Sequence, residues 1–244
     1  LLKKVGKLKP IITSRPNQLL AVDLIGPFAV PTARGNDMIV TIMDHFTKWP
    51  EAFPIKGKSS KTVANVLVTE VFCRNGIPEA LLSDRGHEFN NELLDEISLL
   101  LKVERRLTTA YHPQSNGLIE RFNGTLIRML RCFVSEEQSD WDVHLPFILF
   151  AYRVSFHQSI GDCPFFLTFG RQPRLPIDAL LSPNVFDPAS SGDAPSITQH
   201  RAELIQTLRK AFIKARHFLK EARQQDEESF NSDRVQNSFQ LGDL

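Results

Sequence analysis

The sequence of residues 82–89 is LSDRGHEF, and the sequence of residues 111–123 is YHPQSNGLIERFN. The first stretch places Asp84 at the end of a predicted strand, and the second places Glu120 just inside a predicted helix. A third acid, Asp23, lies upstream in the apolar stretch AVDLIGP, residues 21–27. Three acids at the ends of separate elements are what a site needs to hold oxygen-seeking divalent cations against a phosphodiester.

Each acid taken alone also has a structural interpretation. Asp23 could belong to a strand-end turn, and Asp84 could form an ordinary Asx turn. Glu120 could pair with Arg121 or Arg128 on a solvated helix face. The order of the acids and the sequences around them favour one joint site over three separate structural roles.

The order Asp23, Asp84, Glu120 resembles the DDE triad of the retroviral integrase catalytic core. Three further stretches resemble the gypsy-type branch of LTR retrotransposons: DHFTKWPEA at residues 44–52, GIP at 76–78 and HPQ at 112–114. The match extends from about Leu19 to Leu180. It implies an α/β fold, with a ribonuclease-H-like mixed sheet flanked by helices and a C-terminal helical extension.

The resemblance implies a metal-dependent polynucleotidyl transferase that processes DNA 3′ ends and joins them to target DNA. Asp23, Asp84 and Glu120 would then be both the catalytic residues and the ligands of two ions, Mg²⁺ or Mn²⁺, which suit a site of carboxylates without soft ligands. The polar side chains around the triad are candidates for contacts with DNA phosphates or bases. They are Lys48, Arg85, Gln114, Asn116, Arg121 and Asn123, each of which is otherwise an ordinary exposed polar residue.

The same resemblance gives expectations for partners and location. The expected partners are DNA, as retroelement ends and target DNA, and further copies of this chain, because one core cannot hold two DNA ends and a target together. The expected location is the nucleus, with the cytoplasm as a second location. Glu88 is a candidate partner of the metal ligands, and His87 has no assigned role.

Composition sets weaker limits. The net charge is +1, which argues against tight DNA binding by this chain alone but not against a DNA enzyme, because local basic patches persist in a neutral chain. The three cysteines are far apart and form no Cys-x-x-Cys pair, which predicts reduced thiols in an intracellular protein. The histidines show no zinc-ligand spacing, so we expect that the zinc module preceding the core in related integrases was removed or lost.

Hydrophobic periodicity predicts strands at residues 18–24, 38–43, 47–55, 80–82 and 103–108. Pro50 and Pro54 place the third strand at an edge or bend it, and the continuous apolar run 38–43 is typical of a central strand. Helices are predicted at residues 60–74, from 90 or 91 to 101, from 117 onward behind an Asn116 cap, at 141–152 and at 196–225. The inward residues expected of the second helix are Leu93, Leu94, Ile97, Leu100 and Leu101, and those of the third are Ile119, Phe122, Leu126 and Leu130.

The predicted organisation has five parts. They are an N-terminal linker (1–17), the integrase core (18–180), a Pro- and Ser-rich linker (181–195), an amphipathic helix (196–232) and the start of a truncated C-terminal module (233–244). The amphipathic helix either packs back on the core or serves self-association. No apolar run approaches the roughly 20 residues of a membrane span, so we expect no membrane association.

Two other functions remain open. The first is a domesticated integrase derivative that binds DNA or protein with reduced or no catalysis, and the near-neutral charge and missing zinc module favour it. The second is a cellular nuclease of ribonuclease-H-like fold acting on RNA–DNA hybrids. It fits the same metals, but it fits the GIP and HPQ stretches poorly.

Overall fold

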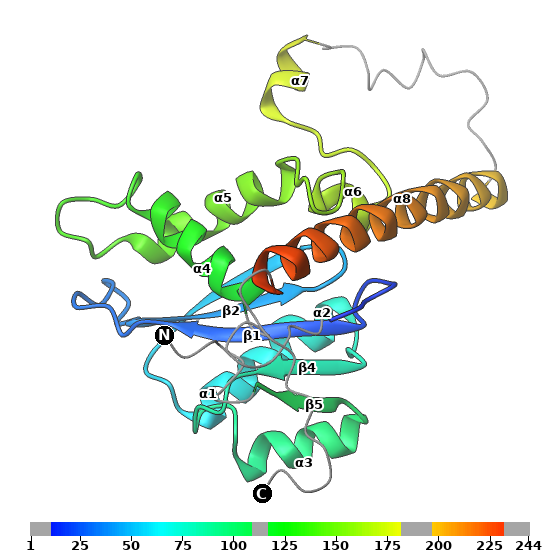
Figure 1. The fold of residues 1–244 in the computed structure, drawn as a ribbon. Helices are drawn as coiled ribbons and strands as arrows, with labels where there is room; N and C mark the ends of the chain where they lie inside the picture. Colours follow the sequence, from blue (N-terminus) through cyan, green and yellow to red (C-terminus); the bar gives the residue numbers. More distant parts are fainter. Residues whose placement is uncertain (1–10, 109–116, 182–196, 232–244) are drawn as a thin grey trace, which may run out of the picture.

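A computed structural model describes residues 11–108, 117–181 and 197–231 (Figure 1). Its strands are β1 (Leu19–Ile25), β2 (Met38–Asp44), β3 (Pro50–Ile55), β4 (Ala80–Ser83) and β5 (Glu104–Leu107). Its helices are α1 (Ser60–Asn65), the π-helical segment η1 (Val66–Phe72), α2 (Cys73–Asn75), α3 (Glu92–Leu101), α4 (Gly117–Leu130), α5 (Trp141–Val154), α6 (Pro164–Phe169), α7 (Pro176–Leu181) and α8 (Ile197–Asn231).

The five strands form one mixed sheet in the order β3-β2-β1-β4-β5. The pairs β3–β2 and β2–β1 are antiparallel, whereas β1–β4 and β4–β5 are parallel. The predicted mixed sheet flanked by helices is therefore confirmed. The two prolines of β3 sit in an edge strand, where a missing N–H is tolerated, and the apolar β2 pairs on both sides.

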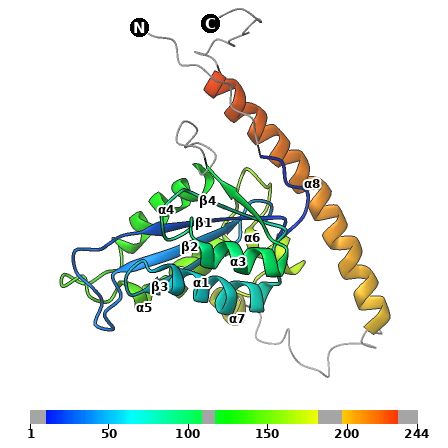
Figure 2. The ribbon, with the colours of Figure 1, turned by 90° about the horizontal axis from the view of Figure 1, so that it is seen from below.

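Successive side chains of a strand point to opposite faces of the sheet, so each face has its own core. Leu20 and Val22 of β1 pack with α1, η1 and α3, whereas Ala21 packs with α4 and α5. Figures 1 and 2 show these two helical layers on opposite sides of the strands. Asp23 shares the parity of Ala21, which directs it toward α4.

The helix predicted at residues 60–74 forms as one helical run with a π-helical middle. Ser59 caps it, because its side chain accepts a hydrogen bond from the Thr62 backbone N–H, and Gly76 ends it with a φ of 88°. The Thr69 hydroxyl donates to the Asn65 carbonyl within this stretch at 2.8 Å. The two ends were predictable from capping residues, but the change of helical pitch was not.

α3 differs from its prediction in the residues that it buries. Leu94 is buried, with Ile97 and Leu101 packed beside it, as expected. Leu93 and Leu100 were expected inward, but they are 38% and 81% exposed. The prediction was too broad because α3 covers the sheet with a narrow stripe, and leucine identity alone does not define the buried arc of a helix.

α4 buries the four apolar residues predicted for it, Ile119, Phe122, Leu126 and Leu130, against the sheet and α5. Its polar face carries Arg121, which is exposed. The helix therefore has one fixed rotation about its axis. That rotation decides which way Glu120 and Asn123 face.

α8 packs back on the core, which is one of the two alternatives for this helix. Ala211, Ala215 and Leu219 are buried with Phe46, and the rings of Phe46 and Phe212 lie 5.3 Å apart. The N-terminal end of α8 projects beyond the core in both views (Figures 1 and 2). The described part of the chain has no helix that is both long and apolar enough to cross a membrane.

Several predictions lie outside the described residues. They concern most of the N-terminal linker (1–10), the HPQ stretch with the Asn116 cap (109–116), most of the second linker (182–196) and the C-terminal module (232–244). The domain limits stay predictions.

Candidate active site

The sheet places the first two acids side by side. β1 and β4 are parallel and pair Leu19 with Ala80 and Ala21 with Leu82. Continuing this register by two residues sets Asp23 opposite Asp84. Both side chains are half-buried. Parallel neighbouring strands thus bring two acids that are far apart in the sequence to one edge of the fold.

α4 supplies the third acid and a link to the first. Glu120 lies in the first turn of α4 and is exposed. One turn later, the Asn123 amide Nδ2 donates a hydrogen bond to Oδ2 of Asp23 at 2.8 Å. Among the described residues Glu120 forms no salt bridge, so the predicted alternative of pairing with Arg121 or Arg128 is not seen.

The surroundings of Asp23 change its titration. Burial first, and then the nearby charges of Asp84 and Glu120, raise the pKa of Asp23 from 3.8 to about 6. Hydrogen bonds from the Leu24 N–H and from Asn123 act in the opposite direction. The ionised form of Asp23 is therefore disfavoured mainly because the carboxyl group is half-buried, with two further acids contributing.

The donor set fits a divalent cation such as Mg²⁺, because all the groups are carboxylate or amide oxygens. Within the described ranges, however, no three His, Cys, Asp or Glu side chains form a ready-made metal cluster. Oδ1 of Asp23 accepts from the Leu24 N–H at 2.9 Å, and Oδ1 of Asp84 accepts from the Gly86 N–H at 2.9 Å. Without a cation, mutual repulsion keeps three carboxylates apart, so the cation itself would have to draw them together.

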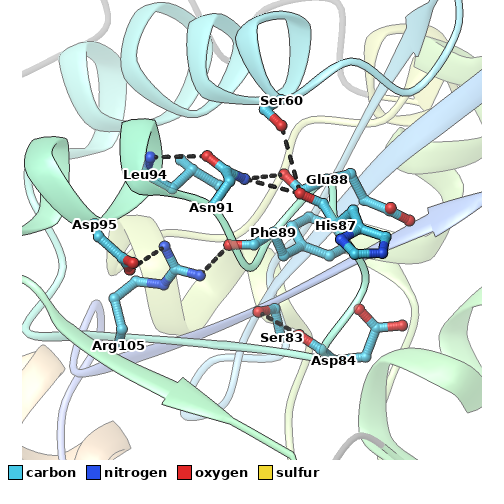
Figure 3. Close-up of polar contacts among 10 residues, drawn as sticks. All are labelled: Ser60, Ser83, Asp84, His87, Glu88, Phe89, Asn91, Leu94, Asp95 and Arg105. Carbon is cyan, nitrogen blue, oxygen red and sulfur yellow. Dashed lines mark hydrogen bonds and ion pairs between the residues drawn. The ribbon is translucent and has the colours of Figure 1, made fainter.

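The turn that follows Asp84 is tethered to other segments by hydrogen bonds. Three side chains donate to backbone carbonyls of the turn: Ser60 to His87, Asn91 to His87 and Glu88, and Arg105 to Phe89. Figure 3 shows these contacts, with the side chains of Asp84, His87 and Glu88 extending toward the same side of the turn. The Asx turn that was the structural alternative for Asp84 is also present, through its bond with Gly86.

Glu88 lies close to this turn. A Cβ on Gly86 would come within 2.8 Å of the Glu88 carboxylate, so the two residues are packed tightly. Lys58 lies 3.9 Å from that carboxylate. Glu88 is thus a further acid beside Asp84, with a lysine as its partner.

The candidate DNA contacts are scattered over different environments. Arg85 is exposed and its Nε donates to the Thr108 carbonyl at 3.0 Å. Arg121 is exposed and lies 3.8 Å from Asp226 of α8. Asn123 is engaged with Asp23, and Lys48 is buried, which leaves Arg85 and Arg121 on the surface. Gln114 and Asn116 lie outside the described residues.

Two charged residues near the site were missed by sequence reasoning. Lys58 approaches Glu88, and Asp226 approaches Arg121. Neither residue stands in a recognisable motif. Both contacts join distant segments, so only the fold reveals them.

This arrangement, a mixed sheet with acids on adjacent parallel strands and on the covering helix, belongs to the ribonuclease-H-like class of folds. Residues 13–113 match the family model "Integrase core domain", so the chain contains an integrase core of the retroviral and retrotransposon superfamily. The chain is 27% identical over 224 residues to the Pol polyprotein of transposon 412 from Drosophila melanogaster, covering 92% of the chain. It is 35% identical over 146 residues to the Gag-Pol polyprotein of feline leukemia virus, covering 59% of the chain.

The chain spans 18% and 8% of the length of these two relatives. Two solved structures share the fold. The intasome of simian T-cell lymphotropic virus, in complex with a PP2A regulatory subunit, aligns with a TM-score of 0.59 and 19% identity over 71% of this chain and 61% of that one. The HTLV-2 integrase catalytic core domain, in complex with magnesium, aligns with a TM-score of 0.51 and 16% identity over 63% of this chain and 97% of that one.

Proposed function

We propose that this chain is the catalytic core of a gypsy-type retroelement integrase, which trims DNA 3′ ends and joins them to target DNA. The observation that carries the proposal is the parallel register of β1 and β4, which continues to Asp23 and Asp84, together with the hydrogen bond to Asp23 from Asn123 of α4, the helix that carries Glu120. The integrase core match supports polynucleotidyl transfer as the reaction class.

Asp23, Asp84 and Glu120 would hold the divalent ions. Mg²⁺ or Mn²⁺, once bound, would activate the attacking oxygen and neutralise charge on the phosphoryl group and the leaving oxygen. The chain's own contribution is positioning. Asn123 orients Asp23, and the tethered turn after β4 fixes Asp84. Arg85 and Arg121 are exposed and would offer guanidinium groups for DNA phosphates.

DNA as partner, assembly into oligomers and a nuclear location belong to the same proposal. The relatives in which such cores occur include an intasome and a trimeric core. Light scattering at high concentration, with and without terminal DNA, tests the assembly. A monomer under both conditions contradicts it.

The decisive experiment compares Asp84→Asn with wild type in a strand-transfer assay with matched terminal DNA, in Mg²⁺ and in Mn²⁺. Asparagine keeps the Oδ1 acceptor for the Gly86 N–H and removes only the charge. We expect loss of joined product below detection. Glu70→Gln, which likewise removes one carboxylate and breaks its pair with Arg74, is the control and should retain joining. Unchanged joining by Asp84→Asn would falsify the proposal.

A second function is favoured by one observation, the lack of a ready-made metal cluster in the described part of the chain. It is a domesticated derivative that binds DNA or protein without catalysis. It predicts DNA binding that survives Asp84→Asn, together with no joined product from the wild type in either ion. The same assay therefore separates the two functions.

A further inference from the structure

A cavity of about 480 Å³ lies against α4, the helix that also carries Glu120. Its walls come from α4, from the segment that joins α5 to α6, and from the C-terminal half of α8. The polar residues that matter for its chemistry are Lys48, Arg121, His157, Ser159, Glu221 and Asp226. Arg121 directly follows Glu120, so the cavity and one of the candidate acids share the first turn of α4.

Lys48 is a buried cation of this cavity. Its side chain is buried, and its Nζ donates one hydrogen bond, to the His45 carbonyl at 2.8 Å. In the part of the chain that the structure describes, no carboxylate forms a salt bridge with it. An ammonium group taken out of water without a paired anion is costly, so an anion that bound here would stabilise the charged form of Lys48.

The surrounding charges do not supply that anion. Burial and the nearby Arg223 lower the pKa of Lys48 to about 7, and Asp44 and Asp226 only partly oppose this. The Asp44 carboxylate already accepts from the backbone N–H groups of Asn17, at 2.9 Å, and Phe46, at 2.7 Å. Asp226 is 61% exposed, so water screens its charge.

The other acid of the cavity is also engaged. Glu221 lies 3.2 Å from His217 on the same helix and is 54% exposed. The carboxylates are thus exposed to solvent, whereas the Lys48 side chain is buried. The basic group of the cavity lies deeper than its acids.

We propose that this cavity binds a phosphate group of the DNA backbone, with Lys48 inside and Arg121 at its mouth. The proposal rests on the proposed function and adds a subsite to it. A phosphate carries several acceptor oxygens on a compact anion, which matches a buried ammonium group and a guanidinium fork. The bound phosphate would take the place of the Asp226 carboxylate beside Arg121. It would belong to a DNA strand whose neighbouring phosphate lies at Glu120.

Two lysines with left-handed backbone provide a matched test. Lys48 has a φ of 60° and Lys102 a φ of 57°, and Lys102 is the exposed C-cap of α3. Glycine suits both positions, so Lys48→Gly and Lys102→Gly each remove one positive charge without backbone strain. Lys48→Met, which keeps the aliphatic packing, controls for the space left by glycine.

The first measurement is the melting temperature of each variant in increasing inorganic phosphate, against chloride at the same ionic strength. Ligand that binds only the folded state raises the melting temperature. We expect a phosphate-dependent rise for wild type and Lys102→Gly, and no rise beyond chloride for Lys48→Gly and Lys48→Met. The same response in all four proteins, or in none, overturns the site.

The second measurement is DNA affinity against salt concentration. We expect Lys48→Gly to bind terminal DNA roughly ten-fold more weakly than Lys102→Gly, with a salt slope smaller by about 0.9, the value for one phosphate contact. Lys48→Gly and Lys102→Gly could bind DNA with equal affinity and equal salt slope while only the Lys48 variants lose the phosphate response. The cavity would then bind free phosphate, and the assignment to DNA would be overturned. If only the proposed function fails, the wild type gives no joined product in the strand-transfer assay. The phosphate response and the difference in DNA affinity between the variants would still be seen.

Discussion

The amide Nδ2 of Asn123 donates a hydrogen bond of 2.8 Å to Oδ2 of Asp23 and so ties α4 to β1. The other amide atom, Oδ1, is buried without a protein partner among the described residues. Asn123 was expected to contact DNA, but in this structure its amide orients an acid.

The first prediction concerns this bond. Asn123→Ala should weaken binding of Mn²⁺ by roughly 10- to 100-fold, the usual cost of losing a group that orients a metal ligand. Calorimetric titration with Mn²⁺ measures it without DNA. Thr125→Ala, on the exposed side of α4, is the control and should bind Mn²⁺ like the wild type. Equal affinities of Asn123→Ala and wild type would remove Asn123 from the site.

The second prediction concerns pH. The folded-state pKa of Asp23 is about 6, against 3.8 ordinarily, so between these values the folded chain binds more protons than the unfolded chain. Its contribution to the free energy of unfolding is therefore greatest at low pH and is lost as pH rises through about 6. Urea unfolding of wild type and Asp23→Asn across this range measures the difference between them.

We expect the stability of wild type relative to Asp23→Asn to fall as pH rises in metal-free buffer. Added Mg²⁺ should oppose the fall, because a cation stabilises the ionised carboxylate. Asp44 is also buried with a raised pKa, but it is common to both proteins and cancels. A difference that is flat in pH without metal would contradict the raised pKa of Asp23 in the folded chain.

The third prediction separates two roles of Asn91. Its Oδ1 caps α3 by accepting from the Leu94 N–H at 3.1 Å, and its Nδ2 donates to the carbonyls of His87 and Glu88. Asn91→Asp keeps the cap and loses the two donated bonds, whereas Asn91→Ala loses everything. We expect roughly 0.5–2 kcal/mol of additional destabilisation from alanine, the cost of a lost cap.

Joining activity should respond differently from stability. Both Asn91 variants should lose joining activity to a similar extent, because both release the turn that carries Asp84. Urea unfolding and strand transfer on the same samples make the comparison. Full joining by Asn91→Asp would show that the turn does not depend on these bonds.

Most structural features that depend on local sequence patterns could be predicted from the sequence. The β1–β5 strands, the buried stripe of α4 and the Asn91 cap follow from alternation, helical period and capping chemistry. Each of these depends on residues within one turn or one strand. The order of the three acids, joined to the family resemblance, predicted the candidate site, and the roles of its residues stay predictions.

What the sequence did not predict depends on contacts between distant segments. Lysine is ordinarily exposed, and no sequence pattern around Lys48 indicated that α8 and α4 would enclose its side chain. The approach of Asp226 to Arg121 joins residues from two helices that no pattern relates. The exposure of Leu100 on α3 has the same origin, because the neighbouring elements decide how much of a helix is covered.

The last prediction tests how α8 reaches the core. Gly161 has a φ of +64°, and a Cβ there would overlap the Phe218 ring of α8. Gly35 has a φ of +80°, but a Cβ there would meet only the flexible Lys56 side chain, at 3.5 Å. Alanine at either position costs roughly 1–2 kcal/mol for the left-handed backbone. Gly161→Ala should cost roughly 1–3 kcal/mol more, because the ring must move.

If that extra cost comes from α8, the helix should also detach more often. Limited proteolysis within residues 204–223 should be faster for Gly161→Ala than for Gly35→Ala, since the overlap with Phe218 weakens the packing of Ala215 and Leu219 on Phe46. Because α8 also forms one wall of the cavity around Lys48, the phosphate response of Gly161→Ala should weaken in parallel with its protection. Equal cleavage and equal stability of the two variants would mean that α8 does not need the close approach that Gly161 permits.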